Sequence, residues 1–212
     1  MIKTPGLTRN FIAIAAIAGL ITGNLASPLG ETPARAISSC PNGWTAVEVN
    51  GVDSCQKVFS GGGDTPSTWT VPEGVTSASV IVNGANGGNS VVLSTTCVTG
   101  AHGGFGAQVS AQLTNLASGQ TLNVYSGVGN NQNNCGSPTR TAGEGYKSGG
   151  TGGVGSSPTD NVKHGAGGGG ASAITLGSTP LIIAAGGGGA GGVGGVNSDD
   201  RADGCDANDW NP

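Results

Sequence analysis

Five cysteines are the residues of this chain whose type and spacing point most directly to chemistry. All of them follow residue 36, and in an oxidising compartment such thiols pair. Proximity in the sequence favours two disulfides, Cys40 with Cys55 and Cys97 with Cys135. Cys205 is then left for a partner in another chain or in sequence beyond residue 212. Zinc is not expected, because no CxxC pair is present and there are only two histidines.

A second cluster of chemically capable residues is acidic. Five carboxylates fall within residues 199–209. Calcium is bound by carboxylate and carbonyl oxygens, so Asp199, Asp200 and Asp203 are weak candidate ligands. The spacing of an EF-hand loop is absent. We therefore expect no metal site and interpret the acidic run as a solvated tail.

Catalytic patterns are scarce. His102 and His164 are the only imidazoles, and neither GxSxG nor HExxH occurs. A GxGxxG match at Gly150, Gly152 and Gly155 is expected by chance among 43 glycines in 212 residues. No copy follows a strand and opens a helix, as nucleotide binding requires. The sequence predicts a non-enzymatic protein without a cofactor.

The first 36 residues are predicted to be an export signal, called the leader below. Lys3 and Arg9 form a positive region, residues 11–21 form an apolar region, and Ala34 and Ala36 frame a cleavage site. Cleavage after Ala36 is expected, and the alternative is cleavage after Ala26.

Export predicts a secreted or cell-surface protein. The apolar run is too short for a stable membrane span after cleavage. Two other outcomes stay open, a retained anchor and a lipid on Cys40. After residue 36 the chain carries five Lys or Arg against eleven Asp or Glu, a net charge of −6. This balance argues against nucleic acid as a partner.

Glycine triplets dominate the architecture. Residues 181–196, LIIAAGGGGAGGVGGV, end in three Gly-Gly-X units. A period of three is that of the polyproline II helix, and glycine allows such helices to lie close together. Shorter tracts occupy residues 83–89, 102–107 and 148–155. The predicted structural glycines are Gly167, Gly168, Gly169, Gly170, Gly186, Gly187, Gly188, Gly189, Gly191, Gly192, Gly194 and Gly195.

Alternating segments between these tracts predict β-strands. One strand precedes the turn at residues 72–74 and another follows it, with Ala78, Val80 and Val82 on one face. Further strands are expected at residues 91–98, 105–113, 122–128, 171–176 and 181–184. Tyr125 falls on the face opposite Leu122 and Val124. No segment after the leader has helical periodicity.

The predicted organisation has five parts. These are the leader at 1–36, a small disulfide-closed module at 37–59 with Trp44 as its anchor, a Gly-rich linker at 60–67, a glycine-rich β domain at 68–196 and an acidic tail at 197–212. The glycine content of 43 residues and the low contents of charged residues (9%) and aromatics (4%) are expected to rule out a conventional globular core.

Four motifs carry a resemblance to a known family. In order they are TWTVPEGVTSASVIVNGANGG, GGFGAQVSAQL, SGQTLNVYSGVG and GGGGASAITLGSTPLIIAAGGGGAGG. Across residues 69–196 the chain resembles the glycine-rich domain of secreted bacterial proteins, which is similar to that of the anaplastic lymphoma kinase and leukocyte tyrosine kinase receptor ectodomains. The resemblance implies an all-β, tumour-necrosis-factor-like β-sandwich with inserted polyproline II glycine helices.

The chain departs from that family in two places. The family often has an acidic and a basic residue after GGGGAS, where this chain has Ala173 and Ile174. The family also usually continues into a closing strand, so the domain is expected to be incomplete at its C-terminus.

The expected function is that of a secreted or cell-surface binding or structural module. Its partner would be an extracellular protein, a glycan or a surface. One alternative is an adhesin-type receptor-binding tip. An ice-binding protein is the less favoured alternative, because the X residues are mixed and not a regular series of Thr or Ala.

Overall fold

The protein is all-β throughout the part of the chain described by this computed structural model. That part comprises residues 11–15, 40, 42–49, 52–92, 98–99, 101–129, 141–153, 165–191 and 203–207. Within these ranges there are strands and extended segments and no helix. The predicted all-β class is therefore confirmed.

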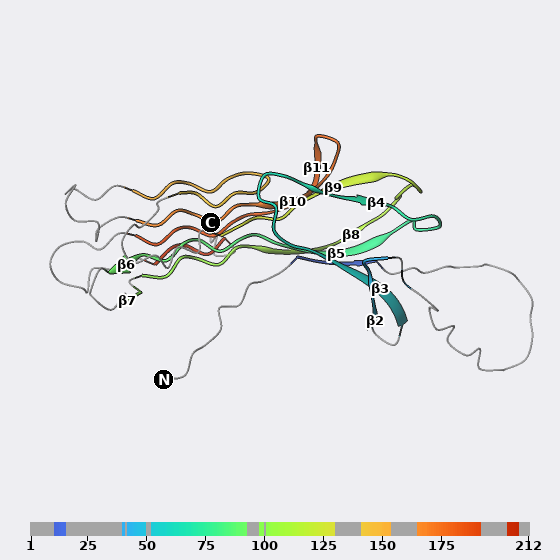
Figure 1. The fold of residues 1–212 in the computed structure, drawn as a ribbon, viewed down its shortest axis with the longest axis horizontal. Helices are drawn as coiled ribbons and strands as arrows, with labels where there is room; N and C mark the ends of the chain where they lie inside the picture. The colour runs from blue at the N-terminus through green and yellow to red at the C-terminus, as the bar shows by residue number, and fades with distance from the viewer. Residues whose placement is uncertain are drawn as a thin grey trace, which may run out of the picture.

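Two larger antiparallel sheets and one small pair make up the strand framework (Figure 1). The five-stranded sheet has the order β2 (Thr45–Val49), β3 (Val52–Phe59), β1 (Phe11–Ala15), β5 (Ala78–Asn83) and β8 (Gln108–Leu113). The four-stranded sheet has the order β11 (Thr179–Ala184), β10 (Ser172–Leu176), β9 (Thr121–Tyr125) and β4 (Ser67–Thr70). The small pair is β6 (Val91–Val92) and β7 (Val98–Thr99).

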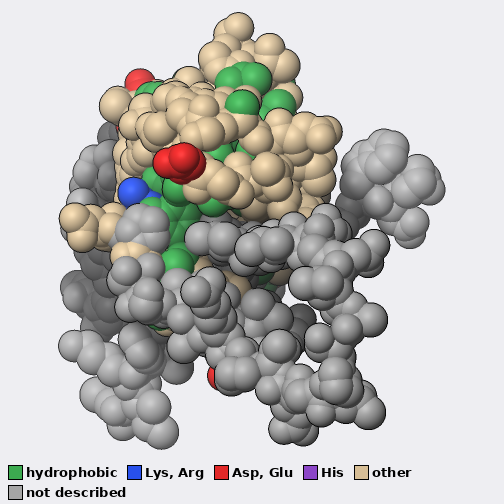
Figure 2. All heavy atoms as spheres, turned by 90° about the vertical axis from the view of Figure 1, so that its right-hand side faces the viewer, with side chains coloured by type: hydrophobic (Ala, Val, Ile, Leu, Met, Phe, Trp, Pro, Cys, Tyr) green, Lys and Arg blue, Asp and Glu red, His purple; other side chains and the backbone are tan. Residues whose placement is uncertain are grey.

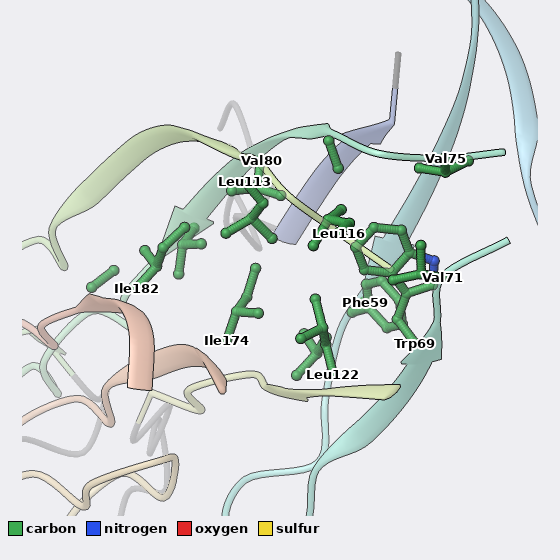
Figure 3. Packing of buried hydrophobic residues seen from close by; sticks show 14 residues of the cluster. Phe59, Trp69, Val71, Val75, Val80, Leu113, Leu116, Leu122, Ile174 and Ile182 are labelled. Carbon is green, nitrogen blue, oxygen red and sulfur yellow. The ribbon is translucent and has the colours of Figure 1, made fainter. Parts of the chain in front are cut away.

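One hydrophobic cluster receives side chains from both larger sheets. The predicted alternation in β5 is confirmed, since Ala78, Val80 and Val82 are at most 2% exposed. From the other sheet, Leu122 and Ile174 are buried in the same cluster. Figure 3 shows Ile174 pointing toward Val80 of β5 and Leu113 of β8. The two sheets thus share a hydrophobic core, and the expectation that the composition rules one out is wrong, because the few large apolar residues are concentrated in the strands.

The expected disulfide-closed module packs against the same hydrophobic cluster. Phe59 at the end of β3 is 5% exposed and belongs to the shared cluster. Trp44 packs against that cluster, with its ring centroid 6.0 Å from that of Trp69. The turn predicted at residues 72–74 is present, and Gly74 has a φ of 79°, which glycine adopts without strain.

Three of the predicted strands differ from the expectation. In place of one strand at residues 91–98, the described residues form β6 and β7, which pair antiparallel with each other. Two other strands are shorter than expected. The strand predicted from residue 105 begins only at Gln108, and Phe105 is 56% exposed. The strand predicted to reach residue 128 ends at Tyr125, and Val128 is 41% exposed. At both places glycines flank the apolar residue, and the backbone bonds to several neighbouring segments at once, so a simple two-sided alternation no longer applies.

The first strand lies inside the predicted leader. Residues Phe11–Ala15 form β1, which pairs with β3 on one side and with β5 on the other. Removal of residues 1–36 during export stays a prediction.

Candidate functional site: the glycine layer

The Gly-rich segments lie side by side at one end of the molecule, beyond the ends of the strands (Figure 1). We call this group the glycine layer; it consists of residues 84–90, 101–107, 126–129, 141–153, 165–171, 185–191 and 203–207. Most of these segments continue a strand directly. Residues 84–90 follow β5, residues 101–107 lead into β8, and residues 185–191 follow β11. The sheets therefore set the positions of the tracts.

Hydrogen bonds between the tracts recur every three residues. Backbone N–H groups of residues 84–90 donate to antiparallel carbonyls of residues 101–107: Gly84 to Ala107, Gly87 to Gly104 and Ser90 to Ala101, at 2.8, 2.9 and 3.0 Å. The residues between them bond elsewhere, because Ala85 and Gly88 donate to the carbonyls of Gly170 and Gly167. One tract is thus joined to different neighbours on different sides.

In the tract at residues 102–107, all six backbone N–H groups donate hydrogen bonds. Gly104 and Ala107 donate to backbone carbonyls of residues 188 and 185. The other four donate to side-chain oxygens: Gly103 to Asn89 (2.8 Å), Gly106 to Asn86 (3.1 Å), His102 to Asp203 (2.7 Å) and Phe105 to Asp206 (2.5 Å). Three surrounding segments therefore satisfy one tract.

The roles of Asn86, Asn89 and Asp206 were not predicted from the sequence. Their signal was present, because Asn-x-x-Asn and Asp-x-x-Asp repeat with the same three-residue spacing as the glycines. The acidic segment, interpreted as a solvated tail, places two carboxylates on backbone donors of the layer.

Of the three weak calcium candidates, one lies among the described residues. Asp203 accepts the hydrogen bond from the His102 backbone, and His102 itself is exposed, as expected for a surface residue. Asp199 and Asp200 lie outside the described residues. Within the described ranges, no group of three or more His, Cys, Asp or Glu side chains is arranged to hold a metal ion.

Many of the predicted structural glycines have no room for a side chain. A Cβ added at any of six of them would collide with a carbonyl oxygen of another tract: Gly167, Gly169, Gly170, Gly186, Gly187 and Gly189. Gly168 and Gly188 have slightly more space, with nearest atoms at 3.3 and 3.1 Å. Gly191 is partly exposed. The predicted glycines Gly192, Gly194 and Gly195 lie outside the described residues.

Close contacts also occur at glycines that the prediction did not include. A Cβ at Gly84 would meet the carbonyl of Ala185, and one at Gly87 would meet that of Gly188. Both belong to the Asn-containing tract, whose three-residue period was recognised. By contrast, a Cβ at Gly150 or Gly153 would meet nothing within 4 Å.

The cysteines are distributed between the sheets and the layer. Cys40 and Cys55 form the predicted disulfide, with their Cα atoms 5.6 Å apart. Cys97 and Cys135 lie outside the described residues, so their predicted pairing is untested. Cys205 lies in the layer, where its thiol is free and exposed and its carbonyl accepts a hydrogen bond from Gly188.

Several apolar side chains are exposed to solvent. Besides Phe105, the β10–β11 hairpin exposes Leu176, Leu181 and Ile183 by 42–47%. Figure 2 views the end of the molecule where the sheets lie, and hydrophobic side chains reach the surface there among few charged ones. Tyr125, predicted to face away from the core, meets Tyr146 edge to face, with ring centroids 5.3 Å apart.

No helix among the described residues is long and apolar enough to cross a membrane. Comparisons of the chain with models of protein families, with curated proteins and with solved structures found no match. The resemblance to the glycine-rich domain therefore rests on the four sequence motifs.

Proposed function

We propose that this protein is an exported, non-enzymatic glycine-rich module that binds an extracellular protein, a glycan or a surface through the outward residues of the glycine layer. One observation carries the proposal. The tracts are bonded to one another at three-residue intervals, and carbonyl oxygens occupy the places where side chains would lie. A flexible linker has neither property. The layer is instead a folded scaffold that can present side chains in fixed positions.

The finer fold proposed is a tumour-necrosis-factor-like β-sandwich with glycine helices of the polyproline II type. Two observations support it. Both larger sheets contribute to one hydrophobic cluster, and the three-residue period of the hydrogen bonds matches the three residues per turn of polyproline II. Both features agree with the resemblance to the glycine-rich domain.

Export is supported by the cysteine chemistry and the leader. The Cys40–Cys55 disulfide is of the kind that persists in oxidising compartments. The leader combines positive residues, an apolar run and small residues at a cleavage site, as export signals do.

The proposal is tested by export followed by binding. The full chain is expressed in an exporting bacterial host, and the protein recovered outside the cytoplasm is applied to cell walls, a glycan array and a panel of extracellular proteins. We expect saturable binding to one of these classes. Phe105→Ala is expected to weaken binding, because this side chain is 56% exposed in the layer. The control is Leu181→Ala, which changes an exposed apolar residue on β11.

If the leader does not direct the export of a reporter fused to it, the exported role is contradicted. Export without binding to any class would contradict the binding role.

A further inference from the structure

Strand β1 occupies a gap between two strands that do not pair with each other. Its five residues pair antiparallel with Cys55–Phe59 of β3, and Ile12–Ile14 pair antiparallel with Ser79–Ile81 of β5. The central residue, Ala13, lies opposite Lys57 on one side and Val80 on the other. The five-stranded sheet is continuous only because β1 is present.

The same residues begin the apolar run of the predicted leader. Cleavage after Ala36 would remove the whole of β1, and cleavage after Ala26 would do the same. Two strand edges would then face each other across the gap, with the backbone donors and acceptors that β1 had bonded left without partners. Such edges bind further strands readily, because backbone groups gain hydrogen bonds whatever the added sequence.

From this geometry we infer that, in the processed protein, the gap between β3 and β5 is a binding site for an extended apolar strand of a partner polypeptide. The inference rests on the proposed export, and it names a ligand class for the exported module. The incoming strand runs antiparallel to both flanking strands and is at least five residues long, as β1 is.

The register also defines the side chains that the site accepts. Position one lies opposite Phe59 and position three opposite Val80, which are 5% and 1% exposed and belong to the core. On its other side, position three lies opposite the half-buried Lys57. These positions therefore require apolar residues. Position two lies opposite Val58, which is 46% exposed, so the alternate positions tolerate more polar residues.

The experiment uses protein that the cell has processed. The full chain is expressed in an exporting host, recovered outside the cytoplasm, and its N-terminus is determined by mass spectrometry. A fluorescent peptide with the sequence of residues 9–16, RNFIAIAA, is then titrated into it. The control peptide carries Ala13→Pro, because proline lacks the N–H that a ladder requires. Hydrogen exchange locates the binding site.

We expect a processed N-terminus, saturable binding of the first peptide, at least tenfold weaker binding of the proline peptide, and slower exchange of backbone amides in β3 and β5. A processed protein that binds neither peptide, or both equally, overturns the inference and leaves the proposed export intact. The inference is also overturned if the processed protein dimerises and the peptide does not dissociate the dimer.

Recovery of exported protein with residues 11–15 still attached also overturns the inference, because β1 is then a permanent strand of the chain. Failure of export overturns the proposed function as well and is recognised by the absence of protein outside the cytoplasm.

Discussion

A single methyl group tests the close contacts of the glycine layer. In Gly87→Ala the new Cβ meets the carbonyl of Gly188 in the neighbouring tract, and a backbone atom cannot rotate away as a side chain would. The two tracts must separate, and we expect a loss of about 1–3 kcal/mol in the free energy of unfolding, as in other overpacked interiors. Denaturant unfolding measures the change.

The matched control for this substitution is Gly150→Ala, because a Cβ there meets nothing within 4 Å. Its expected effect is neutral or a gain of up to about 1 kcal/mol from the stiffer unfolded chain. Equal effects of the two substitutions would mean that the layer does not restrict side chains.

Asp206 accepts a hydrogen bond from the backbone of the glycine layer. Asp206→Ala removes the acceptor of the Phe105 N–H, and the expected loss is about 1 kcal/mol, the usual net contribution of one hydrogen bond. Asp206→Asn keeps an oxygen acceptor at the same place and is expected to lose less. Denaturant unfolding of both variants is the measurement. If Asp206→Asn lowers the free energy of unfolding as much as Asp206→Ala does, a hydrogen-bonding role of Asp206 is contradicted.

The role of glycine at the residue scale was predictable, whereas its partners were not. A three-residue period is a local property, so it predicts that tracts such as residues 185–191 lie close to others. Which tract faces which depends on contacts between distant parts of the chain. His102 and Asp203 are 101 residues apart, and no local pattern joins them.

At the scale of elements, the β2–β3 hairpin is held by a covalent bond. Replacing both Cys40 and Cys55 by Ala opens a loop of 15 residues, and the chain-entropy model gives a loss of about 3 kcal/mol. The loss is expected to reach the core, because β3 ends in the buried Phe59. Thermal unfolding under oxidising conditions measures it.

The control for the disulfide is Cys205→Ser. This thiol is free and exposed, so its replacement is expected to change stability by no more than about 0.5 kcal/mol. A larger effect at Cys205 than at the disulfide would contradict the assignment of the stabilising cysteines.

Strands with one buried face were predictable, as β5 shows, because alternation directly records which side meets the core. The ends of β8 and β9 were not. Phe105 and Val128 continue the alternating pattern in the sequence, yet they lie in the glycine layer, where the hydrogen bonds between tracts follow a period of three. The participation of residues 11–15 in a sheet was also missed, because an apolar run alone does not distinguish a leader from a strand that pairs on both sides.

At the scale of the whole molecule, the sheets and the glycine layer share strands. Residues 84–90 continue β5, whose Val80 and Val82 are buried in the cluster that also contains Trp69. A substitution that displaces residues 84–90 is therefore expected to displace β5 in the core as well. The two regions are expected to unfold as one cooperative unit.

A tryptophan in the core can report on damage introduced in the layer, which makes this cooperativity measurable. Trp44 and Trp69 lie together at the core, so Trp210→Phe is used as the background to restrict the fluorescence to them. In that background Gly87→Ala is expected to lower the midpoint of the fluorescence transition by about 2–4 °C for each kcal/mol lost. Gly150→Ala is expected to leave it in place or raise it slightly. The contradicting outcome is that Gly87→Ala makes the layer sensitive to protease while the fluorescence midpoint stays unchanged. The layer would then unfold separately, because damage to residues 84–90 would not destabilise β5 and the core.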